Sequence, residues 1–321
     1  MNTTRKWVKA GVILLAAGIL ICGISFAILG FDFGKLSTVG YETNTYDVQE
    51  DFQNISIDAD TEKITLVPSG NDICSVVCLE EEDDPHQVSV RDNTLTVERK
   101  EKNRWHLFHI GSITESPEIT VYLPEDAYRE LSIEADTGDV SIPEDFTFDS
   151  ISVSLDTGDV SCLASASGSI TVKTSTGHIT IADVSAAEMR LTASTGKTEV
   201  SNVELTGDLD IRESTGKAVL ENVSCANFSS DGSTGSLLMT NVAASNAFHL
   251  ERDTGNIEFD GCDAETIHVR TSTGKVTGTL LTDKVFVTKT DTGSVHVPET
   301  AAGGRCEITT DTGNIRIEVK S

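Results

Sequence analysis

The stretch Leu131-Ser132-Ile133-Glu134-Ala135-Asp136-Thr137-Gly138-Asp139-Val140 decides the fold, because its pattern returns down the rest of the chain. Apolar and polar residues alternate on both sides of the Asp-Thr-Gly tripeptide, which predicts a strand, a turn and a strand. The tripeptide Ser/Asp-Thr-Gly occurs ten times at spacings of 19 or 20 residues, and a fixed period of this size indicates stacked repeats. Its final residues are Gly138, Gly158, Gly177, Gly196, Gly216, Gly235, Gly255, Gly274, Gly293 and Gly313.

Apolar positions keep their place relative to each glycine. Seven residues before it, every unit has an apolar residue, from Leu131 in the first unit to Cys306 in the last. Five residues before it, Ser230 and Thr288 interrupt an otherwise aliphatic column. A unit of 19 residues is too short for a helix and two strands. The sequence therefore predicts an all-β, single-stranded β-solenoid of about ten rungs with the apolar columns inside, roughly 48 Å long at a strand spacing of about 4.8 Å.

The ten glycines are predicted to be structural turn residues. An Asp or Ser side chain can accept a hydrogen bond from the backbone two residues on, which starts a turn. Glycine adopts positive φ at little cost. The alternation between Asp and Ser at the first position fits a turn former better than a catalytic residue.

The chain before the repeat also predicts strands. Residues 46–123 contain six short alternating runs, and we interpret them as irregular β structure that caps the solenoid over residues 124–321. Asp60-Thr61-Glu62 resembles a degenerate copy of the turn, with Glu62 where glycine is expected. Residues 32–45 read as a polar linker.

The order of these segments resembles a known family. A membrane anchor is followed by a strand region with Leu95-Thr96-Val97 and Val121-Tyr122-Leu123-Pro124, and then by rungs such as Leu131–Val140. This arrangement is similar to the bacterial putative-adhesin family of β-solenoids of unknown function, common in Gram-positive bacteria. The resemblance covers residues 46–319 and implies the fold. It brings no catalytic residues to this chain.

The N-terminus predicts a membrane anchor. Residues 10–31 are uncharged and mostly apolar, and about 20 such residues span a bilayer as a helix. The basic tail 1–9 contains Arg5, Lys6 and Lys9, so the positive-inside rule places the N-terminus in the cytoplasm and the solenoid outside the cell membrane. A cleaved signal peptide is the competing interpretation.

The chain is strongly acidic, with 51 Asp and Glu against 24 Lys and Arg and a net charge of −27. Such a surface repels nucleic acid, which we do not expect as a partner. Cationic peptides, a basic protein, divalent cations or another envelope ligand are the expected partners. The acidity also has a simpler interpretation, since it keeps a long repeat protein soluble.

One stretch outside the N-terminus is both basic and aromatic, and it lies in residues 99–109. Either it is a hairpin extension that packs its rings on the capping strands, or it contacts a partner or the membrane surface. The predicted contact residues are Arg104, Trp105, His106, Phe108 and His109.

The cysteines predict neither disulfides nor a metal site. Cys162, Cys225, Cys262 and Cys306 stand at least two rungs apart, about 9.6 Å, which is too far for a bridge. A zinc set of Cys74, Cys78, His106 and His109 would require that segment to be a loop. We therefore expect no metal and no cofactor.

The leading prediction is a non-catalytic binding or structural module of the cell envelope, acting in adhesion or in sensing envelope stress. The alternative is a carbohydrate-active β-helix enzyme, a polysaccharide lyase or hydrolase, with carboxylates and lysines on one outward face. Its candidate column is Asp139, Asp159, Lys197, Lys217 and Lys275. An aspartic-protease interpretation of Asp136 and Asp156 would need a pocket. Because the chain ends on a strand, Ile315–Val319, the C-terminal rung is expected to be an open edge that could self-associate.

Overall fold

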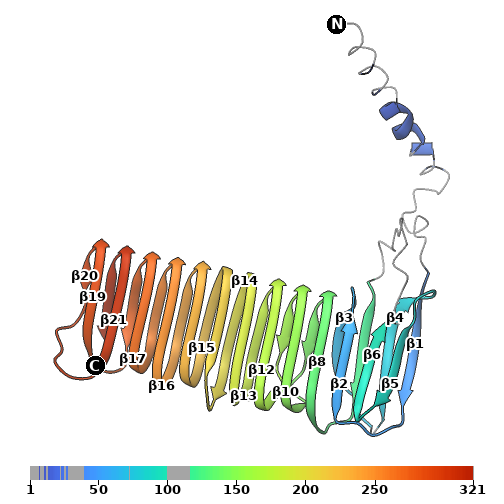
Figure 1. Cartoon of the computed structure of the whole chain (residues 1–321), viewed down its shortest axis with the longest axis horizontal. Coiled ribbons are helices and arrows are strands. Elements are labelled where there is room, and N and C mark those ends of the chain that lie inside the picture. Colours follow the sequence, from blue (N-terminus) through green and yellow to red (C-terminus); the bar gives the residue numbers. More distant parts are fainter. Residues whose placement is uncertain are drawn as a thin grey trace.

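The computed structural model describes residues 7, 11, 14–21, 23, 24, 27, 40–71, 73–99 and 116–320. They form a long rod of stacked parallel strands with a smaller antiparallel group at the N-terminal end (Figure 1). The described residues between 7 and 27 are helical. Within the described part of the chain, no helix has the length and apolarity needed to cross a membrane. The predicted anchor, residues 10–31, lies partly outside that part.

The six strands predicted in the capping region are all present, and a further strand, β1, begins inside the segment predicted as a linker. The capping strands are β1 (Tyr41–Val48), β2 (Asn54–Ala59), β3 (Lys63–Pro68), β4 (Cys74–Glu81), β5 (His86–Arg91), β6 (Thr94–Arg99) and β7 (Glu118–Leu123).

The rod is built from strands that run round each rung, some so continuous that they pass from one rung to the next. They are β8 (Ala127–Thr137), β9 (Val140–Ile142), β10 (Thr147–Thr157), β11 (Val160–Cys162), β12 (Ser165–Thr176), β13 (Ile179–Ala186), β14 (Glu188–Leu205), β15 (Leu209–Thr234), β16 (Leu237–Thr254), β17 (Ile257–Thr273), β18 (Val276–Leu280), β19 (Lys284–Thr292), β20 (Val295–His296), β21 (Gly304–Thr312) and β22 (Ile315–Val319).

Each repeat makes one full circuit, as predicted. Ile151 pairs with Leu131 on one side and with Ile170 on the other, and these residues form one column of the core. The column seven residues before the glycine is at most 2 % exposed in every rung except the one that contains Phe286. A single apolar core therefore runs the length of the rod.

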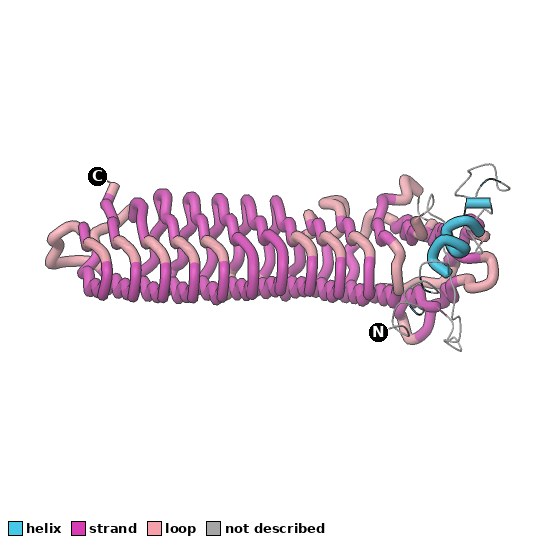
Figure 2. The backbone as a smooth tube through the Cα atoms, turned by 90° about the horizontal axis from the view of Figure 1, so that it is seen from above, coloured by secondary structure: helices cyan, strands magenta, loops and turns pink. Residues whose placement is uncertain are grey.

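The glycine corners align in a file along the rod, where turns follow one another (Figure 2). The Gly158 N–H donates to the Thr176 carbonyl of the next rung, and this bond recurs along the file. A Cβ on Gly196 would lie 1.8 Å from the Gly177 carbonyl oxygen. Glycine is thus required because backbones approach closely, and not merely because seven of the ten residues have φ between 134° and 158°.

A second corner carries a ladder of amides that the sequence analysis missed. Asp183, Asn202, Asn222 and Asn241 have φ between 52° and 58°, a region that Asn and Asp tolerate better than most residues. The Asn202 Nδ2 donates to Asp183 Oδ1 at 2.9 Å, and Asn222 and Asn241 repeat this bond at 2.9 and 3.1 Å. The ladder satisfies side chains that must stack at this corner.

One buried ion pair interrupts the apolar core of the middle rungs. Arg252 spans a rung to reach Glu213 at 3.5 Å, and its guanidinium donates to Ser230 at 2.8 Å. Gly232 lies between the two charges, and a Cβ there would be 2.8 Å from the guanidinium carbon. The polar residue at position 230, an exception in the aliphatic column, is therefore the hydrogen-bond acceptor of a buried arginine.

The prediction that the C-terminal rung is the open edge is wrong. Strand β21 pairs with β17 on one side and β19 on the other, and β22 lies between β18 and β20. The last turn in the sequence is therefore inserted, and β19–β20 is the last rung in space (Figure 1). After β18 the chain leaves room for one rung and forms β19–β20 beyond it. It then returns, and β21–β22 fills that room.

The N-terminal end shows the same reversal. Strand β2 pairs with β6 and β8, and β3 pairs with β7 and β9, all in parallel. The β2–β3 rung thus lies between β6–β7 and β8–β9. Beyond it, β4 pairs antiparallel with β7 and β1, while β5 pairs antiparallel with β6. These antiparallel strands cover the N-terminal end of the rod.

Candidate functional site

The corner of the β2–β3 rung differs from the ten glycine corners. Gly138 stacks on it, because a Cβ there would lie 2.1 Å from the Glu62 carbonyl oxygen. Glu62 therefore occupies the glycine position, as the degenerate Asp60-Thr61-Glu62 turn predicts. Its carboxylate accepts the N–H groups of Asp60 and Thr61 at 2.9 and 2.8 Å. A charged side chain thus stands at the position that glycine holds in the ten repeats.

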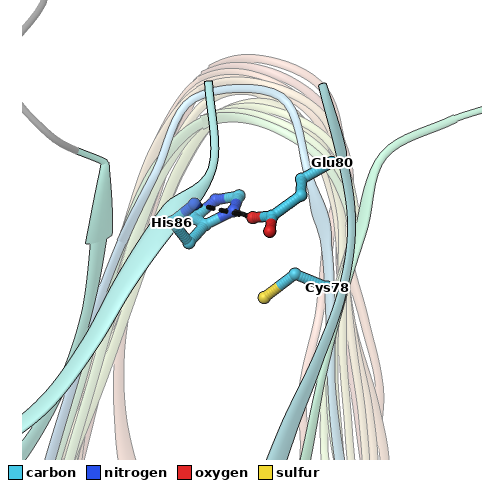
Figure 3. A group of neighbouring side chains, drawn as sticks. All are labelled: Cys78, Glu80 and His86. Atoms are coloured by element: carbon cyan, nitrogen blue, oxygen red, sulfur yellow. Dashed lines mark hydrogen bonds and ion pairs between the residues drawn. The ribbon is translucent and has the colours of Figure 1, made fainter. Parts of the chain in front are cut away.

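The consecutive strands β4 and β5 cover this corner with a second carboxylate, Glu80. One Glu80 oxygen, Oε2, accepts the His86 backbone N–H at 2.6 Å and meets His86 Nδ1 at 2.5 Å (Figure 3). The other, Oε1, accepts Tyr46 Oη–H and Asn44 Nδ2–H, both at 2.7 Å. Burial raises the pKa of Glu80, but these hydrogen bonds outweigh it and hold the pKa below its ordinary value.

Arg99, at the end of β6, binds the same corner. Its guanidinium pairs with Glu62 and lies 3.5 Å from Asp60 and 3.3 Å from Asp84. Burial lowers the pKa of Arg99, and the neighbouring carboxylates raise it by more. We call Glu62, Cys78, Glu80, Asp84, His86 and Arg99 the cap cluster. Its three carboxylates outnumber its one permanent cation.

Two groups of the cap cluster are held less tightly. His86 Nε2 is buried without a hydrogen-bond partner, although Glu62 Oε1 lies 3.6 Å away. Cys78 projects inward from β4, two residues before Glu80, and burial raises the pKa of its thiol to about 12. Donor atoms of Cys78, Glu80 and His86 all lie within 4.8 Å of one another.

The predicted contact residues Arg104, Trp105, His106, Phe108 and His109 lie outside the described residues. They belong to the sequence between β6 and β7, where the rungs β8–β9, β10–β11 and β12–β13 have a turn of two residues. Arg99 is the one residue of the stretch 99–109 that the structure describes, and it belongs to the cap cluster.

Two members of the zinc set considered from the sequence, His106 and His109, lie outside the described residues. Within the described residues, His86 is the histidine that approaches this thiol, and the sequence analysis did not single it out. The substitution of Glu62 for glycine was the signal that marked this corner. All six described cysteines are buried, and none of them forms a disulfide.

The column proposed for an enzyme contains Asp139 and Asp159, and both carboxylates bind the backbone of a neighbouring rung. Asp139 Oδ1 accepts the Asp159 N–H at 2.9 Å, and Asp159 Oδ1 accepts the His178 N–H at 2.7 Å. These side chains thus link successive rungs. Asp136 and Asp156, in contrast, line a surface hollow of about 410 Å³ together with Asp58, Asp60 and Glu134. We call these five carboxylates the acidic hollow.

Comparison with known proteins gives a family and several distant structures. A putative adhesin from Parabacteroides distasonis is 12% identical, with a TM-score of 0.45, over 87% of this chain and 98% of its own. A putative adhesin from Bacteroides fragilis is 14% identical, with a TM-score of 0.39, over 87% and 97%. A putative lipid binding protein from Parabacteroides distasonis is 14% identical, with a TM-score of 0.43, over 86% and 97%. No curated protein matches.

The sequence model of the family described as Toastrack DUF4097 matches residues 52–217 and 206–321. These two ranges contain the cap cluster and all ten glycine corners. The match confirms the resemblance that the rungs suggested. This chain belongs to the Toastrack DUF4097 family.

Proposed function

We propose that this chain is a non-catalytic binding module, a rigid acidic rod that a helix over residues 10–31 holds on the outer face of a bacterial membrane. In this proposal the rod serves adhesion or the sensing of envelope stress by binding cationic partners. The observation that carries it is the register of the strands. The strands pair in parallel and in register, so outward side chains at equivalent positions of neighbouring rungs lie about 4.8 Å apart. Where these side chains are carboxylates, they form rows along the rod.

The acidic hollow is the clearest of these rows. Asp58 pairs with Glu134 across β2 and β8. Asp136, two residues further along β8, and Asp156 on β10 lie at equivalent positions, next to the paired residues Thr137 and Thr157. Burial raises the pKa of Asp58, and the charges of Glu134 and Asp60 raise it further. Like charges this close repel one another. A cationic ligand would relieve that repulsion, and we infer that such ligands bind here.

Binding of a lysine decapeptide to the full chain in detergent tests this proposal. The test variant carries Asp58→Asn, Glu134→Gln, Asp136→Asn and Asp156→Asn. The control variant carries Glu188→Gln, Glu204→Gln, Glu221→Gln and Asp253→Asn, all exposed residues outside the hollow. Both variants lose the same charge. We expect the test variant to bind about tenfold more weakly at low salt and the control to change much less.

Two outcomes would overturn the proposal. If the wild type does not bind the peptide, the rod is no receptor for cations. If both variants weaken binding equally, the effect belongs to net charge and not to the hollow.

The same hollow also suits the enzyme alternative, because it gathers carboxylates in a concavity. That alternative predicts release of new reducing or unsaturated sugar ends from acidic or neutral polysaccharides. It also predicts that Asp136→Asn and Asp156→Asn would abolish the release. Incubation of the full chain with such polymers distinguishes the two functions, since the binding module releases nothing.

A further inference from the structure

We propose that Cys78, Glu80 and His86 form a binding site for one divalent transition-metal ion of the Zn²⁺ type at the N-terminal cap. This site lies inside the cap, and the proposal does not depend on binding at the acidic hollow. The ion would lie beside the corner of the rod at which Glu62 replaces glycine.

The donors have the right chemistry. Thiolate, imidazole and carboxylate together are the ligands that Zn²⁺ takes in proteins, and a thiolate disfavours Ca²⁺ and Mg²⁺. All three residues are buried, with exposed fractions of 0% for Cys78 and Glu80 and 3% for His86. Their donor atoms lie within 4.8 Å of one another. Ligands about 2.0–2.3 Å from a common ion span a space of this size.

The strands place the donors by an elementary rule. Residues two apart on a strand point to the same face, so Cys78 and Glu80 of β4 both face inward. His86, the first residue of β5, faces them from the next strand of the chain (Figure 3). The site therefore sits on two strands of the framework, a rigid position that suits a metal.

Glu80 is already oriented as a ligand. Tyr46 and Asn44 donate to Oε1, which leaves Oε2 directed at the imidazole. Hydrogen bonds of this kind, from groups outside the coordination sphere, position metal ligands in known sites. An ion between the two residues would replace the contact between Glu80 Oε2 and His86 Nδ1.

The electrostatics also favour a cation. The carboxylates of Glu62, Glu80 and Asp84 are buried here, and the guanidinium of Arg99 is the one permanent positive charge in the cap cluster. His86 Nε2 has no hydrogen-bond partner, a costly arrangement for a buried polar atom. A divalent ion would neutralise the excess charge. It would also displace the thiol proton of Cys78, because a bound metal ion stabilises the thiolate.

The second ring nitrogen of His86 faces a further carboxylate. Glu62 Oε1 lies 3.6 Å from His86 Nε2 and is the nearest further oxygen that the structure gives to this ring. With the ion on Nδ1, the proton of the imidazole sits on Nε2, and this carboxylate positions the ring by facing that N–H. A water would provide the fourth ligand, which gives the tetrahedral number that Zn²⁺ prefers.

Co²⁺ titration of the full chain in detergent tests the site, because Co²⁺ reports bound thiolate by a charge-transfer absorption. We expect one equivalent per chain, with a thiolate band that Zn²⁺ then abolishes. Cys78→Ala and Cys78→Ser should both lose the band, and His86→Gln should weaken binding about tenfold or more. Circular dichroism of each variant shows whether the β-rod is intact.

Cys74→Ser is the matched control, because Cys74 is also buried and faces inward from the same strand. It should keep the full band and affinity. Absence of a thiolate band in the wild type would overturn the proposal. Loss of the band in Cys74→Ser, or its survival in Cys78→Ala, would do the same by placing the metal elsewhere.

Discussion

The two ends of the rod share one exchange of rungs but differ in how the displaced rung is covered. At both ends the chain passes over one layer, and the layer is filled by a segment from elsewhere in the sequence, β2–β3 at the N-terminal side and β21–β22 at the C-terminal side. The displaced N-terminal rung, β6–β7, is covered by antiparallel strands and a buried charge cluster. The displaced C-terminal rung, β19–β20, has no such cover within the described residues.

This difference shows in the side chains. Glu62 and Glu80 are fully buried at the N-terminal cap, whereas Val285, Val287 and Val295 are 38–44% exposed at the C-terminal end. A stacked repeat must end somewhere, and its last rung has an unpaired edge. Here one end buries charge to close the core, and the other leaves apolar residues in contact with water.

The largest effect is expected at the closed end. Arg99→Met would leave Glu62 and Asp84 without their guanidinium partner, and breaking a buried ion pair costs about 3–5 kcal/mol. Because repeat proteins lose structure in parts, the loss should stay local. Hydrogen exchange should rise in β2–β7 and remain unchanged in β14–β16.

The control for this prediction is Arg316→Met, which removes an exposed pair with Glu318 and should cost less than about 1 kcal/mol. Uniform exchange throughout the Arg99 variant would mean that the cap does not unfold on its own.

A matched pair of phenylalanines compares the open end with the rod interior. Phe248 and Phe286 hold the same column position, but Phe248 is 1% exposed and packs edge-on against Phe228, while Phe286 is only partly buried. Phe248→Ala should lower the free energy of unfolding by about 3–5 kcal/mol, and Phe286→Ala by about half of that or less. Urea unfolding followed by circular dichroism measures both. Equal losses would show that the terminal rung is covered in solution.

The smallest effect on stability should come from the edge itself. We propose that the self-association expected of an open edge takes place at β19–β20, where two copies can pair by two-fold symmetry. Val287→Lys would place a charge on that edge, with little cost in an exposed position. Sedimentation of the full chain in detergent should show dimers of the wild type at high concentration and monomers of the variant. A monomeric wild type would contradict this.

Much of the regular fold could be predicted from the sequence. Ten glycines at a constant spacing, with alternating strands around them, predict one circuit per unit, and the core columns follow from the same alignment. The degenerate corner at Glu62 could also be identified, because the tripeptide around it is preserved.

The order of the rungs could not be predicted. Every rung presents a similar apolar interior, so stacking β21 on β17 buries residues much as stacking β19 there would. The cap cluster was missed because Arg99, His86 and Glu62 are far apart in the sequence and meet only through that exchange of layers. Ser230 interrupts the aliphatic column in the sequence for a similar reason. Its hydrogen-bond partner, Arg252, is 22 residues away and cannot be recognised from the pattern.

Disulfide cross-linking across the outer face tests the exchange of layers most directly. Thr309 pairs with both Arg270 and Lys289, so these three outward positions lie on consecutive rungs in the order 270, 309, 289. Neighbouring rungs are about 4.8 Å apart, within reach of a disulfide, and alternate rungs are about 9.6 Å apart, beyond it. The variant Arg270→Cys with Thr309→Cys should cross-link under mild oxidation, and Arg270→Cys with Lys289→Cys should not. The opposite result would mean that the rungs stack in the order of the sequence, and the account of both ends would fail.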